Sequence, residues 1–213
     1  MGMFCYQCQE TARNKCCEFG GVCGKSEDLA DLQDLLIYTL KGISEIVIRG
    51  KLDIKHLREV NHEVVKSLFM TITNANFDDE VIIDKVKQMI LMRNELRKKV
   101  SIEDLHDAAT FEINTMRDML FKASYAGLIP NEDKDIRSLK QLITFGLKGL
   151  AAYTYHALNL EKEMDEIYFF CYEALSATLD LESSIEKLVA LAMKTGEFGV
   201  KAMALLDEAN TSK

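Results

Sequence analysis

Residues 26–50 read SEDLADLQDLLIYTLKGISEIVIRG, and this stretch decides the fold. Ser26 is a typical N-cap residue, acidic residues follow it in the first turn, and Gly50 is a typical helix terminator. Between them, apolar residues recur at the three- and four-residue spacing of one helix face: Leu29, Leu32, Leu36, Leu40, Ile43 and Val47. The pattern predicts a helix of about six turns with one buried face.

Two further helices are predicted after this one. Asp53 can cap a helix that ends at the Asn74-Ala75-Asn76 break, and Asp78 can cap one that runs to Leu96. Short links between three helices predict a three-helix bundle over residues 26–100. The composition agrees, because the 213 residues include only one Pro and 11 Gly. We therefore expect an all-α chain.

The next segment, residues 101–130, is predicted to hold a connecting helix and a break. Ser101-Ile102-Glu103-Asp104 is a capping signal for a helix that runs to about Tyr125. Gly127, Pro130 and Asn131 then form the clearest interruption of the chain.

The second half of the chain repeats the first. Residues 32–43 (LQDLLIYTLKGI) align without gaps onto residues 139–150 (LKQLITFGLKGL), at an offset of 107. Helices are expected at about 135–158 and 162–179, with a last helix capped by Ser183 and broken near Thr195-Gly196. Residues 131–213 thus read as a second three-helix bundle related to the first by an internal repeat. Chance similarity between two Leu-rich amphipathic helices is the alternative, and the shared Leu-Lys-Gly step favours duplication.

Charge and hydropathy exclude several classes of partner. The formal net charge is -8 and the pI is near 5.1, which argues against nucleic acid or an anionic membrane as the main partner. The longest apolar runs are far shorter than the roughly 18 residues that span a bilayer, and no signal peptide precedes the first cysteines. A cytoplasmic protein in a reducing compartment is expected.

Five of the six cysteines are crowded into residues 1–25, which read as an irregular, glycine-containing loop. The spacing is Cys5-x2-Cys8-x8-Cys17-x5-Cys23, with Cys16 as a substitute for Cys17. Four thiolates in a short loop can surround an iron–sulfur cluster, because each iron takes one cysteine sulfur. Zinc is a rival, but a zinc ribbon usually repeats the x2 pair, and free thiols on a tail are the third alternative. The spacing favours iron–sulfur.

The cysteine loop and the following helix resemble the start of the hybrid-cluster proteins, also called prismane proteins or hydroxylamine reductases. The resemblance rests on MFCYQCQETA at residues 3–12, on Cys17, on GVCGK at 21–25 and on DLQDLL at 31–36. LLDEANT at residues 205–211 resembles the end of that family's first domain, so essentially the whole chain is covered. That domain consists of a cysteine motif and two three-helix bundles. Met1-Gly2, ahead of the family-like start at Met3, has the character of an added segment.

The resemblance implies that Cys5, Cys8, Cys17 and Cys23 bind one [4Fe-4S] cluster, as in family members with this spacing. Cys16 stands where relatives commonly have glycine, which leaves the choice between Cys16 and Cys17 less certain than the other three ligands. In the family, hydroxylamine or nitric oxide is reduced at a second, hybrid cluster bound by two later domains. The resemblance therefore implies electron transfer toward a catalytic cluster outside residues 1–213, and no hydroxylamine reductase activity from this chain alone.

The expected partners are a redox protein, either a ferredoxin or a flavoprotein reductase, or the catalytic domains themselves. A homodimer is also expected, because helix faces that pack on later domains in relatives would otherwise expose apolar surface. The remaining cysteine, Cys171, lies on an amphipathic segment and is predicted to be a buried core thiol. The alternative function is a helical scaffold or interaction protein whose cysteine loop holds structural zinc or is empty.

Overall fold

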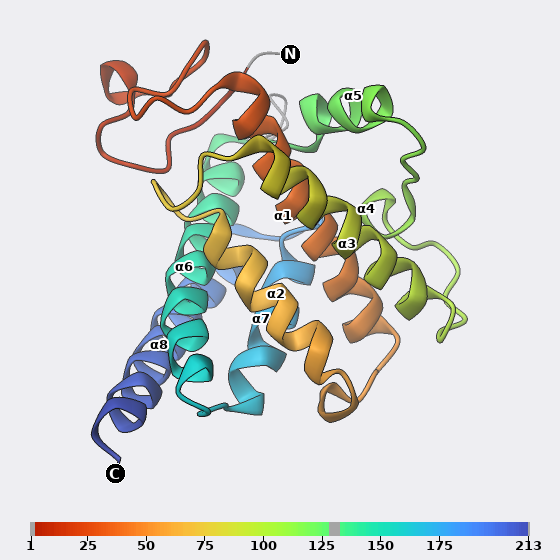
Figure 1. The fold of residues 1–213 in the computed structure, drawn as a ribbon, viewed down its shortest axis with the longest axis vertical. Coiled ribbons are helices and arrows are strands. Elements are labelled where there is room, and N and C mark those ends of the chain that lie inside the picture. Colours follow the sequence, from red (N-terminus) through yellow and green to blue (C-terminus); the bar gives the residue numbers. More distant parts are fainter. Residues whose placement is uncertain (1–2, 128–132, 213) are drawn as a thin grey trace.

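The computed structural model describes residues 3–127 and 133–212, and over these residues it contains eight α-helices and no strand. The fold is therefore all-α, as predicted (Figure 1). Pro130 and Asn131 of the predicted break, and Met1-Gly2, lie outside the described residues. The helices are α1 (Glu27–Arg49), α2 (Arg58–Met70), α3 (Asp79–Arg97), α4 (Asp107–Thr110), α5 (Met116–Ala126), α6 (Lys134–Asn159), α7 (Asp165–Ala177) and α8 (Ile185–Thr211), with 3₁₀ turns η1 (Ala12–Asn14) and η2 (Ile54–His56).

Side-chain caps fix the ends of the first and third helices as predicted. Ser26 accepts a hydrogen bond of 3.1 Å from the Leu29 amide at the start of α1, and Gly50 follows its last residue. Asp78 accepts a hydrogen bond of 3.2 Å from the Val81 amide at the start of α3. Each cap satisfies one of the backbone donors that a helix N-terminus leaves without an intrahelical partner.

Two predicted helix starts are shifted. Asp53 caps the short turn η2 by accepting from the Lys55 amide, and α2 begins only at Arg58. The last helix is capped by Ser184, which accepts from the Lys187 amide, and not by Ser183. In both places the predicted cap residue forms a hydrogen bond in the preceding turn, so the pattern located the helix but not its first residue.

Two further differences concern helix interruptions, one that was not predicted and one that was predicted but is absent. The single helix expected up to Tyr125 is divided into α4 and α5, because Phe111 is extended (φ -56°, ψ 147°) and a capping box between Thr115 and Asp118 starts a new helix. The expected break near Thr195-Gly196 is absent, and α8 is continuous. A glycine inside a helix costs about 1 kcal/mol, which the packing of α8 along α6 offsets.

The helices of the two predicted bundles interlock. In the first half α1 packs on α3, and in the second half α6 packs on α8, as the repeat leads one to expect. The middle helices are exchanged, however: α2 packs mainly on α6, and α7 packs mainly on α1. The buried hydrogen bond from Tyr172 on α7 to Asn61 on α2, 2.8 Å long, joins the exchanged helices. Equivalent helices make equivalent contacts, which is consistent with an internal repeat, while the segment boundaries at 25, 100 and 130 remain a prediction.

One apolar core runs through both halves and holds the predicted buried faces of α1 and α6. None of the described helices is long and apolar enough to cross a bilayer. A second, small cluster of Met3, Cys17 and Ala30 attaches the N-terminal loop to α1. This small cluster positions the cysteine loop described next.

Candidate functional site

The cysteine loop, residues 3–25, lies beside the N-terminal end of α1 (Figure 1). Its two arms are paired at Cys5 and Cys17, whose backbones exchange hydrogen bonds of 3.1 and 2.8 Å. The hydroxyl of Thr11 donates to the Cys5 carbonyl at 3.1 Å and lies 3.8 Å from the Cys17 sulfur. The loop is therefore a closed structure and not a free tail.

Cys17 and Cys16 have opposite surroundings. Backbone N–H groups of Ala12 and Val22 face the buried sulfur of Cys17 and lower the pKa of its thiol. For Cys16, desolvation and the nearby Glu18 carboxylate raise the thiol pKa. The surroundings of Cys17 therefore favour the thiolate form that a metal ligand takes, and those of Cys16 disfavour it.

Glycines allow the loop to turn closely around Cys23, which is exposed. A β-carbon on Gly21 would lie 2.9 Å from the Cys23 sulfur, and Gly24 has a φ of +91°. The backbone at Gly24 therefore favours glycine, and a side chain at Gly21 would have to displace the Cys23 sulfur. This donor set, thiols with backbone amides around them, fits an iron–sulfur cluster. Across residues 3–127 and 133–212, however, no three His, Cys, Asp or Glu side chains are grouped as a metal site requires, and of the predicted ligands the loop pairs only Cys5 with Cys17 through their backbones.

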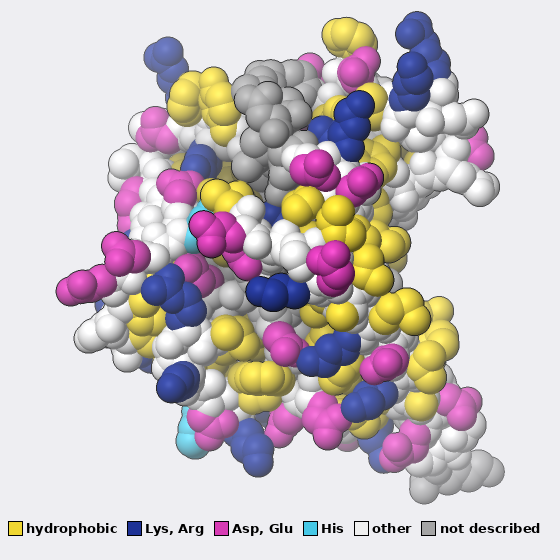
Figure 2. Space-filling model, turned by 180° about the vertical axis from the view of Figure 1, so that it is seen from behind, with side chains coloured by type: hydrophobic (Ala, Val, Ile, Leu, Met, Phe, Trp, Pro, Cys, Tyr) yellow, Lys and Arg dark blue, Asp and Glu magenta, His cyan; other side chains and the backbone are white. Residues whose placement is uncertain are grey.

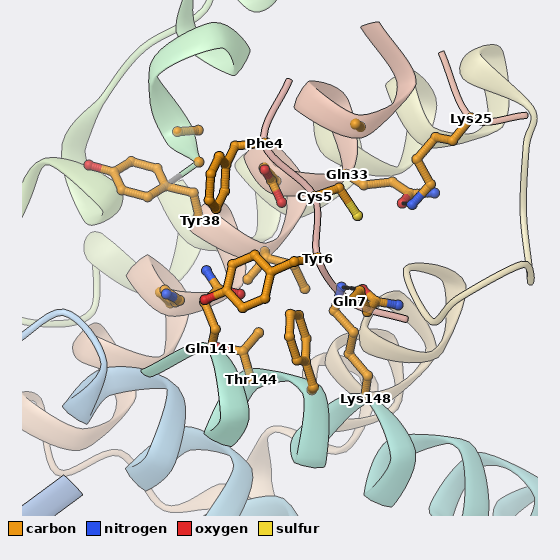
Figure 3. A pocket seen from close by; sticks show the side chains of 17 residues that line it. Phe4, Cys5, Tyr6, Gln7, Lys25, Gln33, Tyr38, Gln141, Thr144 and Lys148 are labelled. Carbon is orange, nitrogen blue, oxygen red and sulfur yellow. Dashed lines mark hydrogen bonds between the residues drawn. The ribbon is translucent and has the colours of Figure 1, made fainter. Parts of the chain in front are cut away.

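A cavity of about 60 Å³ lies beneath the loop, between residues 4–7, α1, the end of α5, and α6 (Figure 3). Its wall on α6 is formed by four residues whose repeat-related positions on α1, 107 residues earlier, also line it. The pairs are Asp34 with Gln141, Ile37 with Thr144, Tyr38 with Phe145, and Lys41 with Lys148. The cavity thus lies between the two repeats, and the segment that carries Cys5 closes it.

Two buried lysines line this cavity. Lys25 and Lys148 are only 7% and 5% exposed, and burial lowers the pKa of Lys148 to about 8. Asp34 is the carboxylate among the lining residues, and burial raises its pKa although Lys148, Lys25 and Lys41 oppose this shift. The Cys5 thiol lines the same cavity, and burial raises its pKa while the Lys25 and Lys148 charges act in the other direction.

Two series of side-chain hydrogen bonds hold the ends of the cysteine loop against both repeats. Lys148 donates to the side chain of Gln7 at 2.8 Å and to the Thr71 carbonyl at 3.1 Å, and Gln7 donates in turn to Thr73. At the other end, Lys25 donates to Gln33 at 2.6 Å, and Gln33 donates to the Asn76 carbonyl at 3.0 Å. These contacts fix the turn between Cys5 and Cys8 and the exit of the loop after Cys23.

These lysines and glutamines were not anticipated as site residues. One signal was present, because the repeat alignment matches Lys41 with Lys148 inside the shared Leu-Lys-Gly step. A basic residue at the same position of two otherwise apolar helix faces indicates a common polar environment. By contrast, Cys171 was predicted correctly: it is 1% exposed in the core, and burial raises its thiol pKa to about 12.

Comparisons with known proteins agree with this loop and its helical support. The model of the Prismane/CO dehydrogenase family matches residues 3–213. A hydroxylamine reductase of Acetivibrio thermocellus is 57% identical over 213 residues, which are 100% of this chain and 39% of the relative. A hydroxylamine reductase of Clostridium perfringens is 47% identical over 219 residues, covering 100% of this chain and 40% of the relative. One from Desulfovibrio desulfuricans is 47% identical over 211 residues, covering 98% and 39%.

Proposed function

This chain belongs to the Prismane/CO dehydrogenase family, and from that premise we propose that its cysteine loop holds one [4Fe-4S] cluster used in electron transfer. The observation that carries the proposal is the loop itself, in which Cys17 is buried with backbone N–H groups directed at its sulfur. Cys5, Cys8, Cys17 and Cys23 would be the ligands, and a bound cluster would supply one-electron chemistry. The backbone pairing of Cys17 with Cys5, and the backbone N–H groups at the Cys17 sulfur, support Cys17 over Cys16.

The proposed role is relay and not substrate chemistry. The chain spans about two fifths of the length of the curated relatives it matches, with 39% of the first and 40% of the second covered. We propose that the reduction of hydroxylamine, for which those relatives are named, takes place at groups outside residues 1–213. A ferredoxin or a flavoprotein reductase is the proposed electron donor. The crowded thiols of the loop favour a cytoplasmic location, where they stay reduced.

Metal and sulfide analysis of anaerobically purified protein tests the cluster. We expect iron and acid-labile sulfide in equal amounts and a brown protein with broad visible absorption. Ser should replace each loop cysteine in turn, with Cys171→Ala as the matched control because Cys171 is buried in the core. Loss of iron in the Cys5, Cys8, Cys17 and Cys23 variants is expected, and Cys16→Ser and Cys171→Ala should keep it. If Cys16→Ser loses iron and Cys17→Ser keeps it, the ligand assignment must be exchanged.

Metal analysis and the visible spectrum also distinguish the proposed iron–sulfur protein from the alternative, a helical scaffold protein. A colourless protein with stoichiometric zinc would replace the relay by a helical scaffold with a structural metal site. Turnover of hydroxylamine with a reduced dye tests the relay directly, and we expect no activity above that of free clusters. Sustained turnover that remains after further purification would contradict the relay.

We also propose self-association through α8. Ile185, Val189, Met193, Val200 and Met203 are exposed, and their spacing places them on one side of the helix. Figure 2 shows apolar side chains gathered along the side of the molecule that ends at the C-terminus. Because large exposed apolar patches tend to be covered, we expect a homodimer. Light scattering over a concentration series should give a dimer for the wild type and a monomer for Met193→Glu.

A further inference from the structure

The cavity beneath the cysteine loop holds more buried positive than negative charge. Lys25 and Lys148 both line it and are nearly inaccessible to solvent, with 7% and 5% of their surfaces exposed. Asp34 is the one carboxylate among the described residues that line it. Burying an ammonium group is costly unless an opposite charge is close, so the arrangement calls for a further negative group.

The hydrogen bonds of the two lysines to neutral oxygens do not remove this charge. Lys148 donates to the Gln7 amide oxygen at 2.8 Å and to a backbone carbonyl at 3.1 Å. Lys25 donates to the Gln33 amide oxygen at 2.6 Å. Amide and carbonyl oxygens satisfy the N–H groups and hold the ammonium groups in place, but they are neutral acceptors.

The side chain of Cys5 lies beside these charges. Figure 3 shows it pointing toward the part of the cavity that Lys25, Gln33 and Gln7 line. A thiolate-bound cluster at this position would bring negative charge to the wall that contains the lysines, and each electron added would increase that negative charge by one.

We propose that Lys25 and Lys148 supply the positive charge that stabilises the reduced state of a cluster held by the cysteine loop, an inference that rests on the function proposed above. An external one-electron donor would supply the electron that reduces such a cluster, and the lysines would form or break no bond. Net charge around an iron–sulfur cluster is one of the factors that set its reduction potential. Both lysines act through the field and are not ligands.

Removing the charge of Lys148 tests the inference. Lys148→Met removes the charge and the hydrogen bonds, whereas Lys148→Gln removes the charge and keeps an amide that can donate. Lys140→Met is the matched control, because Lys140 is on the same helix and 6% exposed but does not line the cavity. The readout is the midpoint potential from an anaerobic redox titration of cluster-loaded protein with dithionite. We expect the reduced-to-oxidised ratio at a fixed potential to fall about tenfold in both Lys148 variants, equal to about 59 mV for a one-electron couple, and to be unchanged in the control.

A second variant covers failure of the first to fold or to take up iron. Gln7→Glu keeps an oxygen acceptor for Lys148 and adds a negative charge, so its midpoint should fall in the same direction. Loaded Lys148→Gln and Gln7→Glu with wild-type midpoints would overturn the inference and leave the cluster proposal intact. A wild-type protein without iron and sulfide would instead overturn the proposed function, and the inference with it.

Discussion

Lys148 on α6 donates a hydrogen bond of 2.8 Å to the side chain of Gln7, which precedes it by 141 positions. Gln7 lies between Cys5 and Cys8, so a residue of the second repeat holds the turn between two predicted ligands. Gln7 also donates a hydrogen bond to the side chain of Thr73, which lies in the link between α2 and α3. The cysteine loop is therefore supported by both repeats, and its geometry depends on how they pack.

Gln7→Leu should loosen this loop more than the rest of the protein. Of the two oxygens that accept hydrogen bonds from the buried ammonium of Lys148, the substitution leaves only the Thr71 carbonyl. We expect faster hydrogen exchange within residues 3–25 and a loss of about 1–3 kcal/mol in the free energy of unfolding. Hydrogen-exchange mass spectrometry of the metal-free protein measures the first effect, and urea unfolding the second. The exposed Gln9 provides the control, Gln9→Leu, and equal exchange in the two variants would contradict the tether.

Two repeat-related glycines should respond in opposite directions to alanine. A β-carbon on Gly42 in α1 would lie 2.0 Å from the Ala108 carbonyl oxygen of α4, whereas one on Gly149 in α6 would meet no atom within 4 Å. Gly42→Ala must displace backbone, so we expect a loss of about 2–3 kcal/mol in the free energy of unfolding. Gly149→Ala should gain up to about 1 kcal/mol from helix propensity. Urea unfolding of both variants is the measurement, and equal effects would mean that α4 does not pack on Gly42.

Local signals in the sequence were sufficient for most helices but not for their packing. Ser26 and Asp78 cap α1 and α3 as predicted, because a cap depends on residues within one turn. The exchange of α2 and α7 between the repeats could not be predicted, because an amphipathic face shows that a helix is buried and not which helix covers it. The division of α4 from α5 depends on Phe111, whose ring packs under the guanidinium of Arg93 from another helix.

In the candidate site too, some features could be predicted from local sequence and others depend on tertiary packing. The cysteines were identified from their spacing, and Cys171 was correctly placed in the core. Lys148 and Gln7 meet only because α6 passes beneath the loop, so their contact depends on tertiary structure. Lys25 is within the recognised GVCGK motif, but its burial against Gln33 could not be read from the motif.

Arg93→Met should destabilise the packing of α3 against α4 and against Phe111, which follows α4. Arg93 is 0% exposed, and it donates to the backbone carbonyls of Ala108 and Phe111 while its guanidinium lies 4.2 Å from the centre of the Phe111 ring. Removing the side chain leaves two buried carbonyls without these donors, so we expect a loss of about 3 kcal/mol in the free energy of unfolding. Arg97→Met, one turn later, removes a side chain that is 37% exposed and should cost about 1 kcal/mol or less. Thermal or urea unfolding compares the two, and similar losses would contradict the assigned role of Arg93.

Asp31 on α1 should make stability fall as the pH rises through the weakly acidic range. Burial, with the nearby carboxylates of Asp34 and Glu27, raises the pKa of Asp31 from 3.8 to about 6. The folded state therefore holds this proton more tightly than the unfolded state does. Its stabilising contribution is complete below pH 3.8 and is lost as the pH passes about 6.

Asp31→Asn removes this dependence, so the variant should match the wild type near pH 4 and exceed it above pH 7. We expect a gain of about 1 kcal/mol in the free energy of unfolding above pH 7, reduced from the full effect of the pKa shift because the side chain is partly exposed. Urea unfolding of the metal-free protein at both pH values measures it. The exposed Glu10 provides the control, Glu10→Gln, which should show no such gain. A gain that is the same at both pH values would mean that Asp31→Asn acts through packing and not through loss of the buried charge.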